Sequence, residues 1–135
     1  MEQYRPIKRG TVKSSIYVEL RDSTTNDVKT GMAFDSAGIV LSYVRGGEAR
    51  VAITPADLAS ATAAWASGGF KEVDATNCPG VYRLDLPTAA LIASDKADEL
   101  IVSIKMTGVK SVNYHVPLTD VADVAMAYSG VRVDS

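Results

Sequence analysis

The single histidine and the single cysteine carry the side chains best suited to acid–base or nucleophilic chemistry. His115 falls on the polar phase of an alternating segment, and a general base needs a partner within hydrogen-bond reach. No Ser–His–Asp spacing identifies such a partner. Cys78 precedes Pro79 and Gly80 in a loop, and one cysteine with one histidine cannot supply the four ligands of a zinc site within one chain. The sequence therefore predicts no catalytic residues, and we expect Cys78 to be a small, partly buried filler.

Oxygen-bearing side chains between positions 22 and 35 are candidates for a calcium site, because Ca²⁺ prefers carboxylate and carbonyl ligands clustered in a loop. The candidates are Asp22, Asn26, Asp27 and Asp35. Their spacing does not match an EF-hand loop. Short side chains that hydrogen-bond their own backbone favour turns, which explains the cluster without a metal. We expect no metal and no cofactor.

Trp65 could present an aromatic surface to a sugar. Its spacing from Leu58 and Ala61 is that of one helix face, which favours packing in the core instead. Two glycine pairs, at 46–47 and 68–69, lack the strand-to-helix pattern with a following Lys and Ser or Thr that cradles phosphate. We interpret them as residues that reverse or end regular elements.

Charge and hydropathy argue against several classes of partner. The 135 residues include 14 Lys and Arg against 16 Asp and Glu, a net charge of −2, so nothing indicates a nucleic-acid or anionic-membrane surface. Charges interrupt every apolar stretch before the roughly 18 residues of a spanning helix, and no apolar leader follows Met1. The chain is expected to remain in the cytoplasm where it is made. With one cysteine it has no internal disulfide, so its core must hold the fold.

Alternation with a period of two dominates the chain and predicts β-strands. In segment 12–21 the even positions form the apolar face and the odd positions the polar one. The polar cluster at 22–27 predicts a turn. Segments 39–45 and 49–54 predict a hairpin, because the glycines between them supply the positive φ of a tight reversal.

The period then changes, and residues 55–67 are predicted to form one short helix. Thr54 can cap it, and Pro55 suits the first helical position because its missing N–H has no partner there. We expect the helix to lie across an open end of the sandwich, with Leu58 and Trp65 facing inward.

Further strands are predicted after this helix, at 70–74, 80–86, 100–106 and 112–118, with a helical turn within 87–94. In segment 80–86 the outward positions are Arg83 and Asp85. The pattern predicts a mainly β fold, an immunoglobulin-like antiparallel two-sheet sandwich of about seven strands. Long crossover helices are lacking, which disfavours a Rossmann-like sheet. The residues expected to be buried between the sheets are Ile16, Val18, Leu84, Leu86, Val102 and Ile104.

Four stretches of the sequence carry a family resemblance: TVKSSIYVELRDSTT (11–25), ARVAIT (49–54), WASGGFKEVD (65–74) and PGVYRLDLP (79–87). They resemble the immunoglobulin-like β-sandwich module of tail, baseplate and fibre-associated proteins of tailed phages. The resemblance covers about residues 10–118, leaving an N-terminal extension at 1–9 and a C-terminal extension at 119–135. It implies a structural role in the virion and offers no catalytic residues to carry over.

Two classes of function are consistent with this sequence. The resemblance favours a non-enzymatic tail, baseplate or fibre-adaptor component of the virion, made in the host cytoplasm, whose partners are other virion proteins and copies of itself in a homo-oligomer. Alternatives are a capsid decoration protein, or a receptor- or carbohydrate-binding module that recognises its ligand through loops. Loops rich in Gly, Ser, Thr, Asn and Asp, rather than in aromatic residues, favour assembly. An enzyme ranks behind both, because the sequence offers no recognisable set of acid, base and nucleophile.

The C-terminal extension contains the candidate interface. Apolar residues from 121 to 128 recur at helical spacing, and a helix of about ten residues is marginal in water unless it packs on something. The alternation of Val131-Arg132-Val133 is that of a strand that could join a sheet edge in another chain. Packing on its own sandwich, docking on a neighbour and disorder remain open. The candidate interface residues are Val121, Val124, Tyr128, Val131 and Val133.

Overall fold

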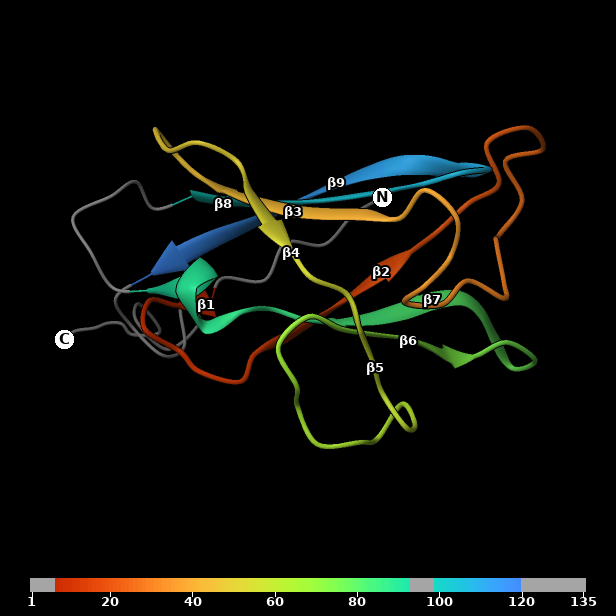
Figure 1. Cartoon of the computed structure of the whole chain (residues 1–135), viewed down its shortest axis with the longest axis horizontal. Helices are drawn as coiled ribbons and strands as arrows, with labels where there is room; N and C mark the ends of the chain where they lie inside the picture. The colour runs from red at the N-terminus through yellow and green to blue at the C-terminus, as the bar shows by residue number, and fades with distance from the viewer. Residues whose placement is uncertain (1–6, 93–98, 120–135) are drawn as a thin grey trace, which may run out of the picture.

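The computed structural model describes residues 7–92 and 99–119, and the fold of this part of the chain is mainly β. Nine strands form one sheet of five and one of four, and the one helical element among the described residues is a short 3-10 turn. Figure 1 shows the two sheets as layers facing each other. The predicted two-sheet sandwich is confirmed.

The five-stranded sheet is built around two hairpins. Its order is β1 (Ile7–Lys8), β9 (Val109–Thr119), β8 (Glu99–Met106), β3 (Val40–Arg45) and β4 (Val51–Ile53). Neighbours are antiparallel except β1 and β9, which run parallel. The predicted β3–β4 hairpin is present, and Gly47 in its turn has a φ of 80°. Ile7 and Lys8, which precede the resemblance, pair with Leu118 and Thr119 and so belong to this sheet.

The four-stranded sheet has the order β2 (Ser15–Glu19), β7 (Cys78–Asp85), β6 (Gly69–Asp74) and β5 (Ala56–Asp57). Only the β5–β6 pair is parallel. The seven longer strands are the seven predicted ones, and β1 and β5 add two residues each. Their division into β2-β7-β6 and β9-β8-β3-β4 is that of an immunoglobulin-like sandwich.

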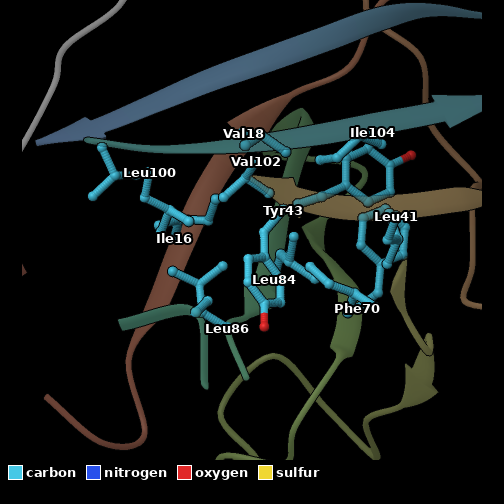
Figure 2. Close-up of a cluster of buried hydrophobic side chains, with 14 of the residues drawn as sticks. Ile16, Val18, Leu41, Tyr43, Phe70, Leu84, Leu86, Leu100, Val102 and Ile104 are labelled. Carbon is cyan, nitrogen blue, oxygen red and sulfur yellow. The ribbon is translucent and has the colours of Figure 1, made fainter. Parts of the chain in front are cut away.

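The core lies between the sheets because the inward position of each long strand is apolar. All six residues predicted to be buried there are at most 5% exposed, namely Ile16, Val18, Leu84, Leu86, Val102 and Ile104. Figure 2 shows side chains from both sheets meeting in this layer. The rings of Phe70 and Tyr82 stack with centroids 5.2 Å apart. The predicted alternation therefore sets the buried face correctly.

One end of the sandwich is closed by η1 (Thr88–Leu91), which lies within the helical turn predicted over 87–94. Its Ala90 and Leu91 are fully buried. Arg45 reaches this end from β3, where its Nη1 donates to the carbonyl of Ile92 at 2.9 Å. The turn therefore packs on the core, and a hydrogen bond just after it ties this end of the sandwich to β3 of the larger sheet.

The opposite end is closed by the loop after β2, which Tyr82 and Glu72 hold. The Tyr82 hydroxyl donates to the Lys29 carbonyl at 2.8 Å and accepts from the Met32 amide at 3.1 Å. Glu72 accepts from the Gly31 amide at 2.9 Å. Burial raises the pKa of Tyr82 to about 12, so its hydroxyl keeps the proton that it donates.

The helix predicted over residues 55–67 is wrong. Ala56–Asp57 form β5, paired in parallel with β6, and the following residues form turns and loop. Leu58 is buried, but it contacts Gly69 on the outer face of the four-stranded sheet: a Cβ added to Gly69 would lie 2.7 Å from Leu58 Cδ2. It therefore does not face the space between the sheets.

Candidate functional site

Residues 58–67, which we call the strap, cross the outer face of the four-stranded sheet. Figure 1 shows this segment beneath β6 and β7, on the side away from the core. Two residues of β7 hold it. The Nη1 of Arg83 donates to the carbonyls of Ala61 and Ala63, both at 2.9 Å, and Asp85 Oδ2 accepts from the Ala66 amide at 3.0 Å.

Arg83 and Asp85 also bind each other, because residues two apart on a strand point to the same side. Arg83 Nε lies 2.7 Å from Asp85 Oδ1, and Nη2 lies 2.8 Å from Oδ2. This two-bond geometry is the strongest that an arginine and a carboxylate adopt. Both were correctly predicted to point outward, but the strap buries them, leaving side-chain exposures of 7% and 0%.

Both members of the pair are charged. The hydrogen bond with Asp85 raises the pKa of the Arg83 guanidinium. Burial acts to raise the pKa of Asp85, but hydrogen bonds from Arg83, Ser15 and the Ala66 amide outweigh it and lower that pKa. The carboxylate therefore accepts four hydrogen bonds without a proton of its own.

The same bonds explain why the strap is not a helix. In a helix, the carbonyls of Ala61 and Ala63 and the amide of Ala66 would bond to backbone groups four residues away. Here they bond to two buried charged side chains. Without these bonds the charged groups would lack hydrogen-bond partners, and leaving buried charges in that state costs several kcal/mol. The capping signal at Thr54 and Pro55 is worth only about 1 kcal/mol, so the long-range contacts prevail.

Trp65 lies on the strap, so its predicted place in the core is wrong. Its ring is half-buried, and Nε1 donates to the Ser14 carbonyl at 3.1 Å. It is not part of the cluster of side chains between the sheets. Tyr17, on the outward phase of β2, is 55% exposed and pairs with Arg83 across the strands. The strap side of the molecule therefore displays two aromatic residues.

The polar cluster at 22–27 is a turn built around Asp22, as predicted. Its Oδ1 accepts from the amides of Thr24 and Thr25 at 2.8 and 3.0 Å, and Oδ2 lies 3.3 Å from Lys29 Nζ. These bonds, led by the one from Thr25, lower the pKa of Asp22 to about 2. Asn26 takes a φ of +64°, which suits its short side chain.

Among the described residues, Asp22 does not form a metal-binding cluster with the other acidic candidates of this region. Asp27 and Asp35 are exposed in the same long connection. Within 7–92 and 99–119, no group of three or more His, Cys, Asp or Glu side chains is arranged to hold a metal ion.

His115 points outward from β9, as predicted, and its Nδ1 lies 2.9 Å from Glu99 Oε2 on β8. A carboxylate beside an imidazole orients the base of a catalytic triad. Here, however, both side chains are about half exposed on an open sheet face, where a reaction would not be shielded from water.

Cys78 begins β7 and its thiol is exposed, so the prediction of a partly buried filler is wrong. It pairs with Asp74 where β6 and β7 reverse direction, and a residue at such a reversal has little protein around it. It belongs to the four-stranded sheet, whereas His115 belongs to the five-stranded one. The structure therefore does not bring the two together.

The outer side of β4, β3, β8 and β9, which we call the open face, is a sheet surface whose residues align in rows across the strands. One row has only small or short polar residues: Ala52, Ser42, Ser103 and Asn113. Of these, Ser42 is only 4% exposed, and its Oγ accepts from Arg50 Nε at 2.6 Å. The next row has larger ones: Val44, Ile101 and His115. Beyond the small row lie Val40 and Lys105, and beyond the large row lie Glu99 and Pro117.

The predicted interface residues Val121, Val124, Tyr128, Val131 and Val133 lie outside the described residues. In the part of the chain that is described, no helix is long and apolar enough to cross a membrane.

Comparisons of the chain with protein-family models, curated proteins and solved structures gave no match.

Sequence reasoning missed the Arg83–Asp85 pair and the open face, though both left a signal. An arginine and an aspartate two apart on one strand lie side by side on the same face. The outward positions of β8 run Glu99, Ile101, Ser103, Lys105, with opposite charges at the two ends. What alternation does not provide is the register between strands, which aligns these positions with those of β3 and β9.

Proposed function

We propose that the chain is a non-enzymatic structural protein of a tailed-phage particle, a tail, baseplate or fibre-adaptor component that joins copies of itself and other virion proteins. The observation that supports this best is the open face, a broad sheet surface with exposed Val40, Lys105 and Glu99. A subunit repeated in a symmetric particle needs a rigid body and such a contact surface. The assignment to a phage rests on the resemblance of residues 10–118.

The placement of the reactive side chains supports a non-enzymatic role. His115 lies on the open face of one sheet and Cys78 at a strand reversal of the other, so neither activates the other. The buried charges Arg83 and Asp85 are engaged in holding the strap. Arg83 and Asp85 thus contribute to the rigidity of the domain, and His115 contributes to the surface of the open face.

Labelling of purified particles tests the proposal. Antibodies raised against the recombinant chain should bind tailed particles produced from the genome that encodes it, and electron microscopy should place the label on the tail, baseplate or fibres. Label on the head would favour the decoration-protein alternative. Particles that assemble normally and contain none of the chain by mass spectrometry would contradict a virion role.

A carbohydrate-binding role is a second candidate, because Trp65 lies on a surface segment rather than in the core, on the same side of the molecule as the exposed Tyr17. Aromatic rings at a partly wet surface suit sugar stacking. As Trp65 is the sole tryptophan, its fluorescence reports directly on that side of the molecule. Titration with host surface polysaccharide should change the emission, and Tyr17→Ala should weaken the effect. Unchanged emission would exclude binding at this position.

A further inference from the structure

The outward residues of β8 have opposite properties on the two sides of its midpoint. Along the open face they run Glu99, Ile101, Ser103, Lys105, with an acidic and a large apolar residue on one side and a small and a basic residue on the other. Val102, which faces the core, marks the centre. A two-fold axis that passes just outside the open face above that centre, parallel to the sheet and perpendicular to its strands, places Lys105 of one copy over Glu99 of the other.

The outward residues of the neighbouring strands are arranged in the same way, with small ones on one side of the centre and large ones on the other. Ser42 and Val44 on β3 lie beside Ser103 and Ile101, and Asn113 and His115 lie beside the same two residues on β9. On β8 and β9 the two-fold axis therefore sets the small residues of each copy against the large residues of the other, whereas Ser42 on β3 is only 4% exposed and accepts a hydrogen bond from Arg50 Nε at 2.6 Å. Sheets packed face to face interdigitate their side chains in this way.

Val40 extends this complementarity to the edge of the face. It is 41% exposed, although it is a large apolar residue beside Lys105. The position related to it by the axis is Gly46, whose amide bonds to the Glu99 carbonyl at 3.1 Å. A valine would thus meet a residue without a side chain, which leaves room for it.

We propose that the open face is a two-fold interface between two copies of this chain, with β8 of one copy antiparallel to β8 of the other. Because it names a second copy as the partner, the inference builds on the proposed role in subunit assembly. An isologous contact requires one patch to complement itself, and the paired rows and charges of the open face meet that requirement. The two Lys105–Glu99 contacts lie about 20 Å apart, at a rise of about 3.3 Å per residue.

The size of the face indicates a weak dimer. Four strands about 4.8 Å apart and some seven residues long offer roughly 400 Å² per copy, about half that of a standard interface. Glu99 also contacts His115, which leaves its second carboxylate oxygen for Lys105 of the partner. We therefore expect association that becomes visible only towards millimolar concentration and is strengthened by repetition in a particle.

Charge reversal tests the register directly. Lys105→Glu sets acid against acid at both ends of the interface, and Glu99→Lys sets base against base, so each variant alone should associate at least tenfold more weakly in sedimentation equilibrium. An equimolar mixture should form a heterodimer, since every contact in it is again between opposite charges. Lys71→Glu, on the strap side of the molecule, is the matched control and should associate like the unmodified chain.

The outcomes separate this interface from the proposed function. An unmodified chain that stays monomeric at all concentrations, or a Lys105→Glu variant that associates normally, would overturn the interface. Ser103→Arg fills the small row and should also abolish association while circular dichroism stays unchanged. If the chain is found in particles but is monomeric in solution, only the interface is contradicted. If the chain dimerises but is absent from particles, only the virion role is contradicted.

Discussion

A buried arginine or aspartate must find partners for its charged atoms, and on β7 those partners come from the strap. Arg83 donates hydrogen bonds to two carbonyls of the strap, and Asp85 accepts one from an amide of the strap, in addition to the bonds between the two side chains. At this scale two side chains determine the path of ten residues. The local preference of those residues for a helix is too weak to compete.

Removing one partner should therefore be costly. We expect Asp85→Ala to lower the free energy of unfolding by about 3–5 kcal/mol, because it leaves the Arg83 guanidinium buried and uncompensated. Urea denaturation measures the change. Asp57→Ala, at an exposed position of β5, is the control and should change stability by less than about 0.5 kcal/mol. Equal midpoints for the two variants would show that the pair does not hold the strap.

Asp22 makes stability depend on acid pH. Its pKa falls from 3.8 to about 2 on folding, so the unfolded chain binds more protons between these values and stability is lost as pH falls through this window. Asp22→Asn keeps an acceptor for the Thr24 and Thr25 amides but does not titrate. Thermal unfolding from pH 5 to pH 2 should show a shallower decline for the variant than for the unmodified chain. Parallel curves would contradict the prediction.

At the scale of elements, alternation predicted the strands because each long strand has one face in the core. Positions that it assigned to the core, such as Leu84 and Val102, are fully buried, but Val12, an even position of segment 12–21, lies before β2 begins and is 58% exposed. The strap could not be predicted in this way. Its conformation depends on Arg83 and Asp85, some twenty residues further along the chain, and the local signal at Thr54 and Pro55 points to a helix. The strands β1 and β5 have only two residues each, which is too short for an alternation of apolar and polar residues to be recognised in the sequence.

The core prediction has a direct stability test. Leu84 is fully buried on β7, an inner strand of the four-stranded sheet, so Leu84→Ala should cost roughly 2–5 kcal/mol through lost burial and the cavity left behind. Val12, at 58% exposure, provides the surface control Val12→Ala. Urea midpoints compare the two. A shift for Leu84→Ala no larger than that for Val12→Ala would show that this position does not support the core.

At the scale of the whole molecule, His115 and Cys78 should be dispensable for folding and for incorporation into particles. Both are at least partly exposed, and neither belongs to the core cluster of the described residues. We expect His115→Ala and Cys78→Ser to give unchanged circular dichroism and normal amounts of the chain in purified particles. Loss of incorporation with the fold intact would reveal a functional site at the altered residue.

Truncation of the C-terminal segment tests whether folding and assembly depend on different parts of the chain. Buried residues of β9 extend to Leu118, and the candidate interface residues Val131 and Val133 follow beyond the described part of the chain. If these residues add a strand to a neighbour, removal of Ser129–Ser135 should leave a folded chain with an unchanged unfolding midpoint that no longer enters particles. The open face is untouched by this truncation, so solution self-association should persist.

Three measurements on the truncated chain decide between the possible roles of this segment. Normal incorporation into particles would refute the docking role, because no other part of the chain is altered. Failure to fold would instead indicate that the segment packs on its own sandwich. A folded, self-associating chain that is excluded from particles would show that two separate contacts build the assembly, one through the open face and one through the C-terminal strand, because only the second has been removed.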